Sequence, residues 1–131
     1  MKITRTDRTQ AKQDPSRVNF FDGEVHFQTL VSSADSDELD LLNVYFSVGA
    51  RTRPHIHKQD QVLQIIEGQG IVATETEKQV VSTGDVILIP KDTWHWHGAT
   101  RHSAMAHTSV MKRGETEWRV EEKNWAAGYD E

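Results

Sequence analysis

Short runs of apolar and β-branched residues, separated by turn-forming residues, recur along most of the chain. They predict strands at Val25–Val31, Leu41–Val48, Val62–Glu67, Ile71–Glu75, Val80–Val81, Asp85–Ile89 and Ala104–Met111. A hairpin is expected around Gly68–Gly70, where glycines can adopt positive φ. Many short strands with close turn spacing are typical of an all-β sandwich, barrel or jelly roll.

The two ends of the chain follow a different pattern. Residues 1–19 are polar and without period, so we expect an arm that becomes ordered only against another strand or another subunit. The tail, Glu115–Tyr129, could hold one short helix. A length of 131 residues is the usual size of one domain, so residues 1–131 are expected to form a single unit.

The amino-acid composition excludes several classes of function for this protein. The formal net charge is −5 and the basic residues are scattered, which argues against a nucleic-acid partner. The chain has no cysteine, so a metal ion must be held by histidine, carboxylate, amide or water. No apolar run approaches the ~20 residues that span a bilayer, and the N-terminus has no apolar signal segment. We therefore expect no membrane partner and a cytoplasmic protein.

Histidines are concentrated in one part of the chain, because six of the seven lie between residues 55 and 107. His55 and His57 are two residues apart, so on a strand both face the same side and can converge on one ion. Gln61 has the same parity and could return its amide oxygen to that face. His95 and His97 form a second pair, and spacing alone does not decide which of the two completes the site.

These two segments resemble the paired motifs of the cupin family. In the first motif, glycine, HxH, glutamate and glycine correspond to Gly49, His55, His57, Gln61 and Gly68. In the second, glycine, PxG, histidine and asparagine correspond to Gly84, Pro90, Asp92, His95 and Ala99. The resemblance implies a jelly-roll barrel (a double-stranded β-helix), with a core at 49–107 and one divalent metal ion on His55, His57, Gln61 and His95.

Gln61 departs from the glutamate that is usual in the first motif. With three imidazoles and one amide, the protein ligands would contribute no negative charge. The ion would keep most of its own charge, which favours binding of anions and alkoxides and strengthens Lewis-acid action. Such a donor set suits Mn, Fe, Ni, Co or Zn, and relative affinity does not choose among them.

A narrower resemblance concerns the strings GART, HWHG and AMAH, which are similar to those of small bacterial cupins with manganese-dependent hydroxynitrile lyase activity. It implies manganese as the metal and His107 as a base in the pocket. It also places three residues in the substrate pocket: Thr52, His97 and Met111. Arg53 and Pro54 depart from the residues expected there.

Two other functions are compatible with these motifs. Cupins with a neutral ligand set also resemble dioxygenases, and a barrel that only binds a small anion or sugar acid is a third possibility. His107 is equally well read as a core histidine bonded to a neighbour. The tryptophans are expected in packing or at an interface, with Trp96 at a subunit contact, whereas Arg51 and Arg53 are expected as solvated rim charges. The assembly expected is a symmetric homodimer or a homotetramer.

Overall fold

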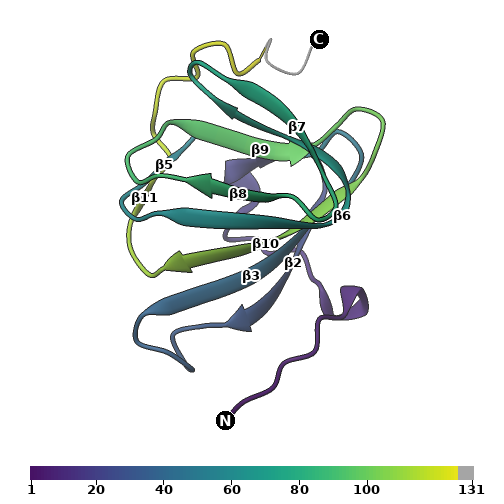
Figure 1. Ribbon diagram of the computed structural model, residues 1–131, viewed down its shortest axis with the longest axis vertical. Helices are drawn as coiled ribbons and strands as arrows, with labels where there is room; N and C mark the ends of the chain where they lie inside the picture. The colour runs from purple at the N-terminus through teal and green to yellow at the C-terminus, as the bar shows by residue number, and fades with distance from the viewer. Residues whose placement is uncertain (127–131) are drawn as a thin grey trace.

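The computed structural model describes residues 1–126 of the chain. Its two helical segments are single 3₁₀ turns, η1 (Arg8–Gln10) and η2 (Val18–Phe20). No helix in this described part is long and apolar enough to cross a membrane. The strands shown in Figure 1 are β1 (Phe21–Asp22), β2 (Val25–Val31), β3 (Leu39–Phe46), β4 (Arg51–Thr52), β5 (Ile56–His57), β6 (Gln61–Thr74), β7 (Lys78–Ser82), β8 (Val86–Ile89), β9 (His95–Ala99), β10 (Met105–Lys112) and β11 (Thr116–Glu117).

The long strand β6 belongs to both sheets of the barrel. Its first part pairs with β8 and β10, and its second part pairs with β7 and β9. One sheet therefore has the order β8-β6-β10-β3-β2, and the other has the order β7-β6-β9-β4-β1 (Figure 1). All these pairs are antiparallel, and the all-β jelly-roll prediction is confirmed.

The predicted hairpin at Gly68–Gly70 is wrong, because β6 runs through it without turning back. Gly68 has φ +71°, and a Cβ there would lie 1.9 Å from the carbonyl oxygen of Ala104. A register shift between Ala106 and His107 on β10 lies opposite the same stretch. The positive φ is therefore used to bend one strand from the first sheet into the second, and not to reverse the chain.

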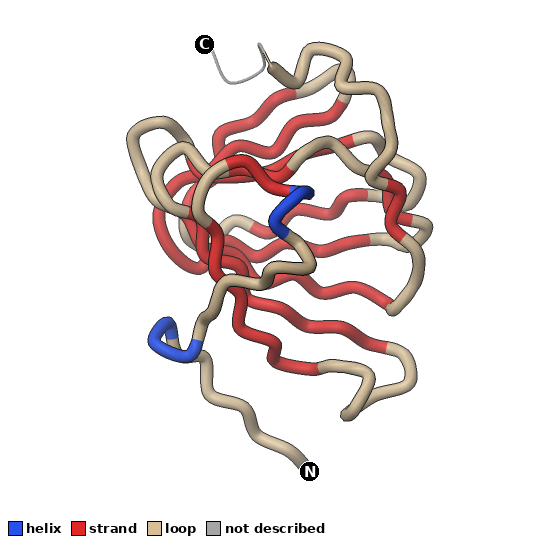
Figure 2. Tube along the Cα trace, turned by 180° about the vertical axis from the view of Figure 1, so that it is seen from behind, coloured by secondary structure: helices blue, strands red, loops and turns tan. Residues whose placement is uncertain are grey.

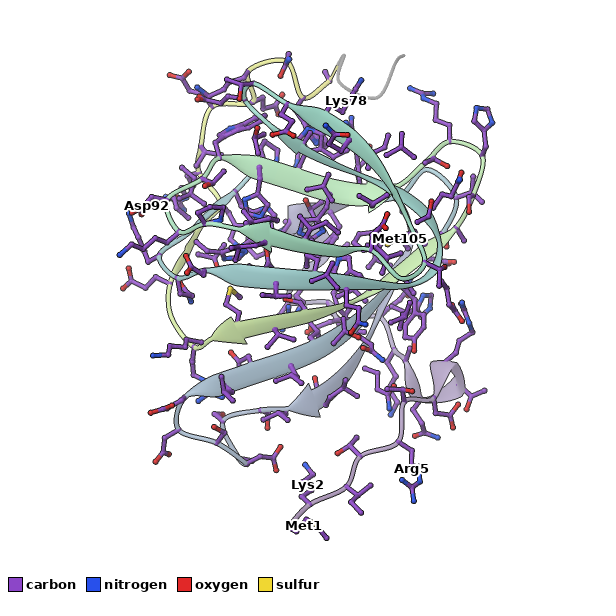
Figure 3. The ribbon with its side chains drawn as sticks, in the orientation of Figure 1. Met1, Lys2, Arg5, Lys78, Asp92 and Met105 are labelled. Atoms are coloured by element: carbon purple, nitrogen blue, oxygen red, sulfur yellow. The ribbon has the colours of Figure 1, made fainter. Side chains whose placement is uncertain are left out.

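Large apolar side chains fill the space between the two sheets. Leu63 and Ile65 from β6, Phe46 from β3 and Met105 from β10 are almost completely buried there. Met105 and Lys2, both labelled in Figure 3, illustrate the contrast, because Met105 at the start of β10 is buried and Lys2 on the N-terminal arm is exposed. The apolar residues alternate with outward-facing ones, as the period of two in a strand requires.

The N-terminal arm lies against β2 of its own chain (Figure 2). Lys12 and Phe27 exchange two backbone hydrogen bonds, of 2.9 and 2.7 Å. The Gln28 side chain accepts from the backbone N–H of Asp7 and donates to the carbonyl oxygen of Arg5, each at 2.9 Å. Thus a strand of the same chain provides the partner for the arm.

The tail contains no helix between Glu115 and Ala126, and residues 127–129 of the expected helix lie outside the described residues. Instead, β11 pairs with β5, and the chain then crosses the outer face of β9. Trp125 packs there with Trp94 and Trp96 in a second apolar cluster. This explains why β9 is buried on both faces.

The expectation that Arg51 is a solvated charge at the rim is wrong, because only 5% of this residue is exposed. Its guanidinium lies 3.9 Å from the centre of the Trp125 ring, and its Nη1 donates to the Trp125 carbonyl oxygen at 2.8 Å. Arg53 pairs with Glu122 at 3.1 Å, closer to solvent. Trp96 is 1% exposed beneath this tail, so it is not presented for a subunit contact.

Candidate metal centre

A backbone bridge brings the two histidine motifs together. His55 donates its N–H to the carbonyl oxygen of His95 at 3.0 Å, and His95 returns the same bond at 3.1 Å. Because the residues are directly opposed, their imidazole centres are 4.3 Å apart. The ring of His57, on β5, lies 4.8 Å from that of His55 and 5.3 Å from that of His95.

Two turns within the second motif, at Gly84 and at Asp92, have a backbone geometry that few residues adopt. Gly84 has φ +97° and open space around it, so glycine is required there for its φ and not for its size. Asp92 has φ +65° at the position where the family motif has glycine, and aspartate tolerates this region better than most residues. The N–H of Asp92 donates to the carbonyl oxygen of His57 at 2.8 Å, which ties the two motifs together.

Hydrogen bonds to Nδ1 orient two of the imidazoles. Nδ1 of His55 lies 2.7 Å from the carbonyl oxygen of Arg53, and Nδ1 of His95 lies 2.9 Å from that of Thr93. A carbonyl oxygen only accepts hydrogen bonds, so each Nδ1 carries the proton. The lone pair is therefore on Nε2 of each ring, which is the arrangement typical of a metal-binding histidine.

His57 and Gln61 are oriented in the same way by groups on distant strands. Nδ1 of His57 lies 2.8 Å from the hydroxyl of Thr116, and its buried Nε2 has no hydrogen-bond partner within residues 1–126. The amide nitrogen of Gln61 donates to the hydroxyl of Ser109 at 2.9 Å. Its oxygen then lies 3.3 Å from Nε2 of His95, so two acceptors face each other. A cation between them would relieve that repulsion.

Burial keeps these imidazoles neutral. It lowers the pKa of His57 to about 4 and that of His95 to about 4. Burial, followed by the neighbouring imidazoles of His95 and His57, holds the pKa of His55 well below its usual value. Neutral imidazoles offer lone pairs to a metal ion without first releasing a proton.

A second pair of histidines adjoins this group. Nε2 of His107 and Nδ1 of His97 are 3.0 Å apart and form a hydrogen bond, in which one nitrogen carries the proton and the other accepts it. His55, His95 and His97 form a group whose ring nitrogens all lie within 4.8 Å of one another, and His57 is not part of this group. Burial lowers the pKa of His107 to about 4 and holds that of His97 well below its usual value. Nε2 of His97 and Nδ1 of His107 have no partner in the part of the chain that the structure describes.

The donor atoms therefore fit a divalent transition-metal ion. The centre offers neutral imidazoles with free Nε2 atoms and one amide oxygen, and these ligands suit Mn, Fe, Ni, Co or Zn. Sequence spacing does not distinguish His95 from His97, but their hydrogen bonds in the structure do. Nδ1 of His95 is bonded to the backbone, whereas Nδ1 of His97 is bonded to His107.

The centre opens into a cavity of about 360 Å³. The four residues expected in the pocket, Thr52, His97, His107 and Met111, all line it, together with His55, His57 and Gln61. His107, Ser109 and Met111 reach it from β10 because alternate residues of a strand face the same side. His95 is fully buried behind this lining.

The cavity also has walls that the sequence motifs do not indicate. Arg17 and Phe20 from the N-terminal segment and Thr116 and Trp118 from the tail line it. Figure 2 shows η2 of that N-terminal segment. In the sequence, these walls are indicated by aromatic residues, Phe20 and Trp118, that occur in otherwise polar stretches. Among the described lining residues Arg17 carries the single permanent charge, and none is a carboxylate.

Comparisons with known proteins agree with this geometry. The Cupin domain family matches residues 43–111. The chain is 30% identical over 114 residues to an (R)-mandelonitrile lyase of Granulicella tundricola, covering 86% of each. It is 39% identical over 46 residues to an acireductone dioxygenase of Parasynechococcus marenigrum, but this match covers 32% of the chain and 25% of that protein.

A cupin-like protein of Thermotoga maritima has a solved structure with a similar fold. The TM-score is 0.81 at 28% identity, covering 96% of this chain and 100% of that one. The chain belongs to the cupin family, as the spacing of its two motifs predicted. Its buried histidines could hold a divalent metal ion in the manner of that family.

Proposed function

We propose that the protein is a manganese-dependent hydroxynitrile lyase, which cleaves a cyanohydrin to an aldehyde and hydrogen cyanide. The observation that carries the proposal is a neutral set of donors beside a hydrogen-bonded histidine pair, at a cavity whose described lining residues include no carboxylate. Similarity to a mandelonitrile lyase over 86% of both chains supports the same reaction class.

The residues that would hold the metal are His55, His57 and His95 through Nε2, and Gln61 through its amide oxygen. Each of them has its other polar side-chain atom bonded to protein, at 2.7–2.9 Å. His97 differs in the kind of partner, because its Nδ1 is bonded to a second titratable imidazole, that of His107, at 3.0 Å and not to a carbonyl or hydroxyl group. We therefore assign His97 to the pocket and not to the ligand set.

A bound divalent ion supplies Lewis-acid chemistry, since it polarises an alcohol or carbonyl oxygen. The chain supplies the proton acceptor. His107 is neutral at pH 7, and when its Nε2 proton is donated to His97, Nδ1 has a lone pair. The hydroxyl proton of the cyanohydrin passes to Nδ1 of His107, and the bond to the nitrile carbon breaks with its electron pair on cyanide. That proton then passes to cyanide, so hydrogen cyanide and aldehyde leave.

The electrostatics of the cavity suit this reaction. The products include an anion before it is protonated, and no acidic side chain of residues 1–126 lines the cavity to repel it. Neutral ligands leave the positive charge of the ion largely uncompensated. Arg17 lines the wall, but its charge is compensated by Asp14, with which it pairs at 3.1 Å.

The experiment that tests the proposal is an assay of mandelonitrile cleavage by the manganese-loaded protein and its His107→Ala variant. We expect cleavage by the parent protein and a loss of about 10²-fold or more in the variant. The exposed His102→Ala variant is the matched control and keeps the parent rate. Equal rates for the parent and His107→Ala would remove His107 from the mechanism, and no cleavage by the parent protein would overturn the proposed activity.

A metal-dependent dioxygenase is the second candidate, favoured by the partial match to an acireductone dioxygenase. Oxygen consumption on addition of an enolic substrate distinguishes it, because the lyase needs no oxidant. Tight ligand binding without turnover would indicate a carrier or sensor. A homodimer or homotetramer and a cytoplasmic location remain predictions from the sequence.

A further inference from the structure

Phenylalanine is concentrated at one place in this protein. The chain has four phenylalanines, and all four line the cavity beside the histidines. Phe46 is 2% exposed, but Phe20, Phe21 and Phe27 are only partly buried. Apolar rings that remain partly uncovered around a cavity provide a surface that an apolar ligand group can cover.

Trp118 joins this aromatic wall to the histidines. Its ring stacks on His55, with centres 4.2 Å apart and planes at 29°, and on Phe20, at 4.5 Å and 14°. It is also tilted against Phe21 at 6.2 Å. The wall continues from Phe21 to Phe46, whose ring lies 5.3 Å from that of His107. The aromatic side chains therefore form a continuous wall that contacts the histidines at His55 and His107.

Backbone pairing fixes the position of Trp118. It follows β11 directly, and β11 is in register with β5, with Thr116 opposite His57. The stacked Phe20 is held from the other end of the chain, since its carbonyl oxygen accepts the N–H of Arg53 at 2.8 Å. The two terminal segments thus meet over the cavity in a defined contact.

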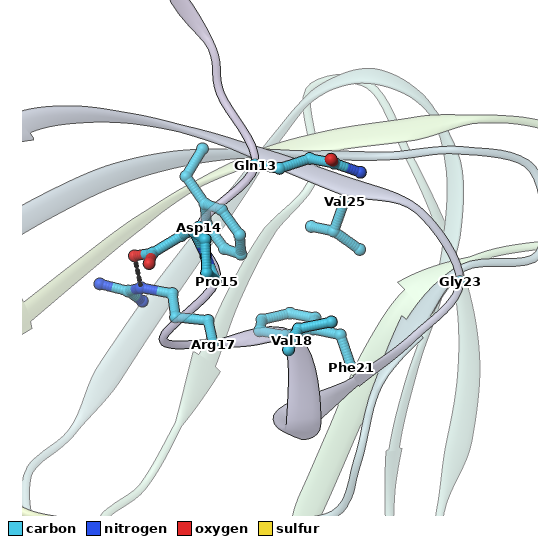
Figure 4. A pocket seen from close by; sticks show the side chains of 9 residues that line it. Gln13, Asp14, Pro15, Arg17, Val18, Phe21, Gly23 and Val25 are labelled. Carbon is cyan, nitrogen blue, oxygen red and sulfur yellow. Dashed lines mark hydrogen bonds and ion pairs between the residues drawn. The ribbon is translucent and has the colours of Figure 1, made fainter.

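The wall is thin on the side of the N-terminal segment. Phe21, Phe27 and Arg17 also line a hollow of about 280 Å³ on its other side, which Figure 4 shows. In that view Arg17 is turned toward Asp14, which it pairs with at 3.1 Å. This ion pair is a local contact within the N-terminal segment, close to Phe20 and Phe21.

The size of the cavity limits what it can take. A dry apolar cavity of about 150 Å³ holds one benzene ring. A space of about 360 Å³ therefore has room for one aromatic ring and a short polar group that reaches the histidines. The aromatic wall would contact the ring, and edge-to-face or stacked contacts favour an aryl over an alkyl group of similar area.

We propose that Trp118 is the specificity-determining residue of this cavity, and that it selects substrates with a single aryl ring on the carbon that bears the hydroxyl group. The inference rests on the proposed lyase function for the identity of the polar group. The recognition of the ring depends only on the aromatic wall, so it can be tested without turnover.

The kinetic test compares two cyanohydrins, the aryl compound mandelonitrile and the alkyl compound 2-hydroxybutanenitrile, in the parent protein and in Trp118→Leu. We expect kcat/KM for the aryl substrate to fall about tenfold more than kcat/KM for the alkyl substrate. Trp118→Phe should retain most of the preference for the aryl compound, because it keeps a ring. An equal loss for both substrates in Trp118→Leu would overturn the inference while the lyase function stands.

The second readout is binding of benzaldehyde and of butanal, measured by calorimetry on the folded protein with metal content recorded. We expect Trp118→Leu to weaken benzaldehyde binding about tenfold more than it weakens butanal binding. Trp125→Phe is the matched control: this buried tryptophan of the same tail does not line the cavity, so binding should be that of the parent. If neither cyanohydrin is cleaved but benzaldehyde binding depends on Trp118, the lyase function fails and the inference holds. Benzaldehyde binding that is independent of Trp118 would overturn it.

Discussion

The hydroxyl of Ser109 accepts the amide N–H of Gln61 at 2.9 Å, and this bond determines which way the amide faces. The amide oxygen is thereby turned toward His95, at 3.3 Å from its Nε2. Ser109 lies 48 residues further along the chain, on β10, so the orientation of a proposed ligand depends on a contact between strands.

Ser109→Ala should weaken metal binding by about 10- to 100-fold, because the amide is then free to rotate and present nitrogen instead of oxygen. A titration of the metal-free protein with Mn²⁺ measures this. Thr108→Ala is the matched control: its hydroxyl donates to Asn43 at 2.6 Å on the opposite face of β10, and manganese affinity should not change. Equal affinities for the parent and Ser109→Ala would show that the bond does not position a ligand.

Gln61→Glu tests the role of a neutral ligand. A carboxylate adds a negative charge to the centre, so we expect tighter retention of Mn²⁺ on dialysis and a lower kcat/KM for mandelonitrile, by about tenfold or more. The same preparation gives both values. Tighter retention with unchanged activity would mean that the neutrality of Gln61 has no catalytic role.

Gly68→Ala should lower the free energy of unfolding by more than about 2 kcal/mol, because φ is positive and the added Cβ would lie 1.9 Å from a backbone oxygen. Gly84→Ala is the comparison, since φ is +97° there but nothing lies within 4 Å. We expect it to cost only about 1 kcal/mol. Urea unfolding of both variants gives the difference, and equal losses would contradict the tight contact at Gly68.

Stability of the metal-free protein should fall as the pH decreases from about 6.5 toward 4. Burial lowers the pKa of His107 to about 4 in the folded state, whereas an unfolded histidine titrates near 6.5. Between these values the unfolded chain binds more protons, so each such group contributes up to about 1.4 kcal/mol per pH unit, and above pH 6.5 the contribution is complete. His107→Gln should reduce the slope of unfolding free energy against pH, and exposed His102→Gln should leave it unchanged. A slope that His107→Gln does not alter would contradict a buried neutral His107.

The features that sequence could predict are those governed by short-range geometry. His55 and His57 are brought to one side by the period of a strand, and their rings lie 4.8 Å apart. The same period could not separate His95 from His97, because both have the same parity. Only the pairing of His55 with His95 and the contact of His97 with His107 distinguish them.

Contacts between residues far apart in the sequence cannot be predicted from the period of a strand. Thr116 bonds His57 across 59 positions, and Trp118 stacks on His55, although both residues lie in a stretch expected to contain a helix. The sequence predicts a positive φ at Gly68, but whether this glycine reverses or bends the strand depends on the strands that pair with β6 on either side. Asp92 shows the converse case, because it adopts φ +65° where the family motif has glycine.

The central claim is that four neutral side chains hold one divalent ion, and elemental analysis tests it most directly. Protein purified without added metal or chelator should contain about one transition-metal ion per chain. His55→Ala purified in the same way should contain almost none, while the exposed His102→Ala control keeps the parent value. Parent protein that is repeatedly free of transition metals, or a His55→Ala variant with the same metal content as the parent, would contradict the account.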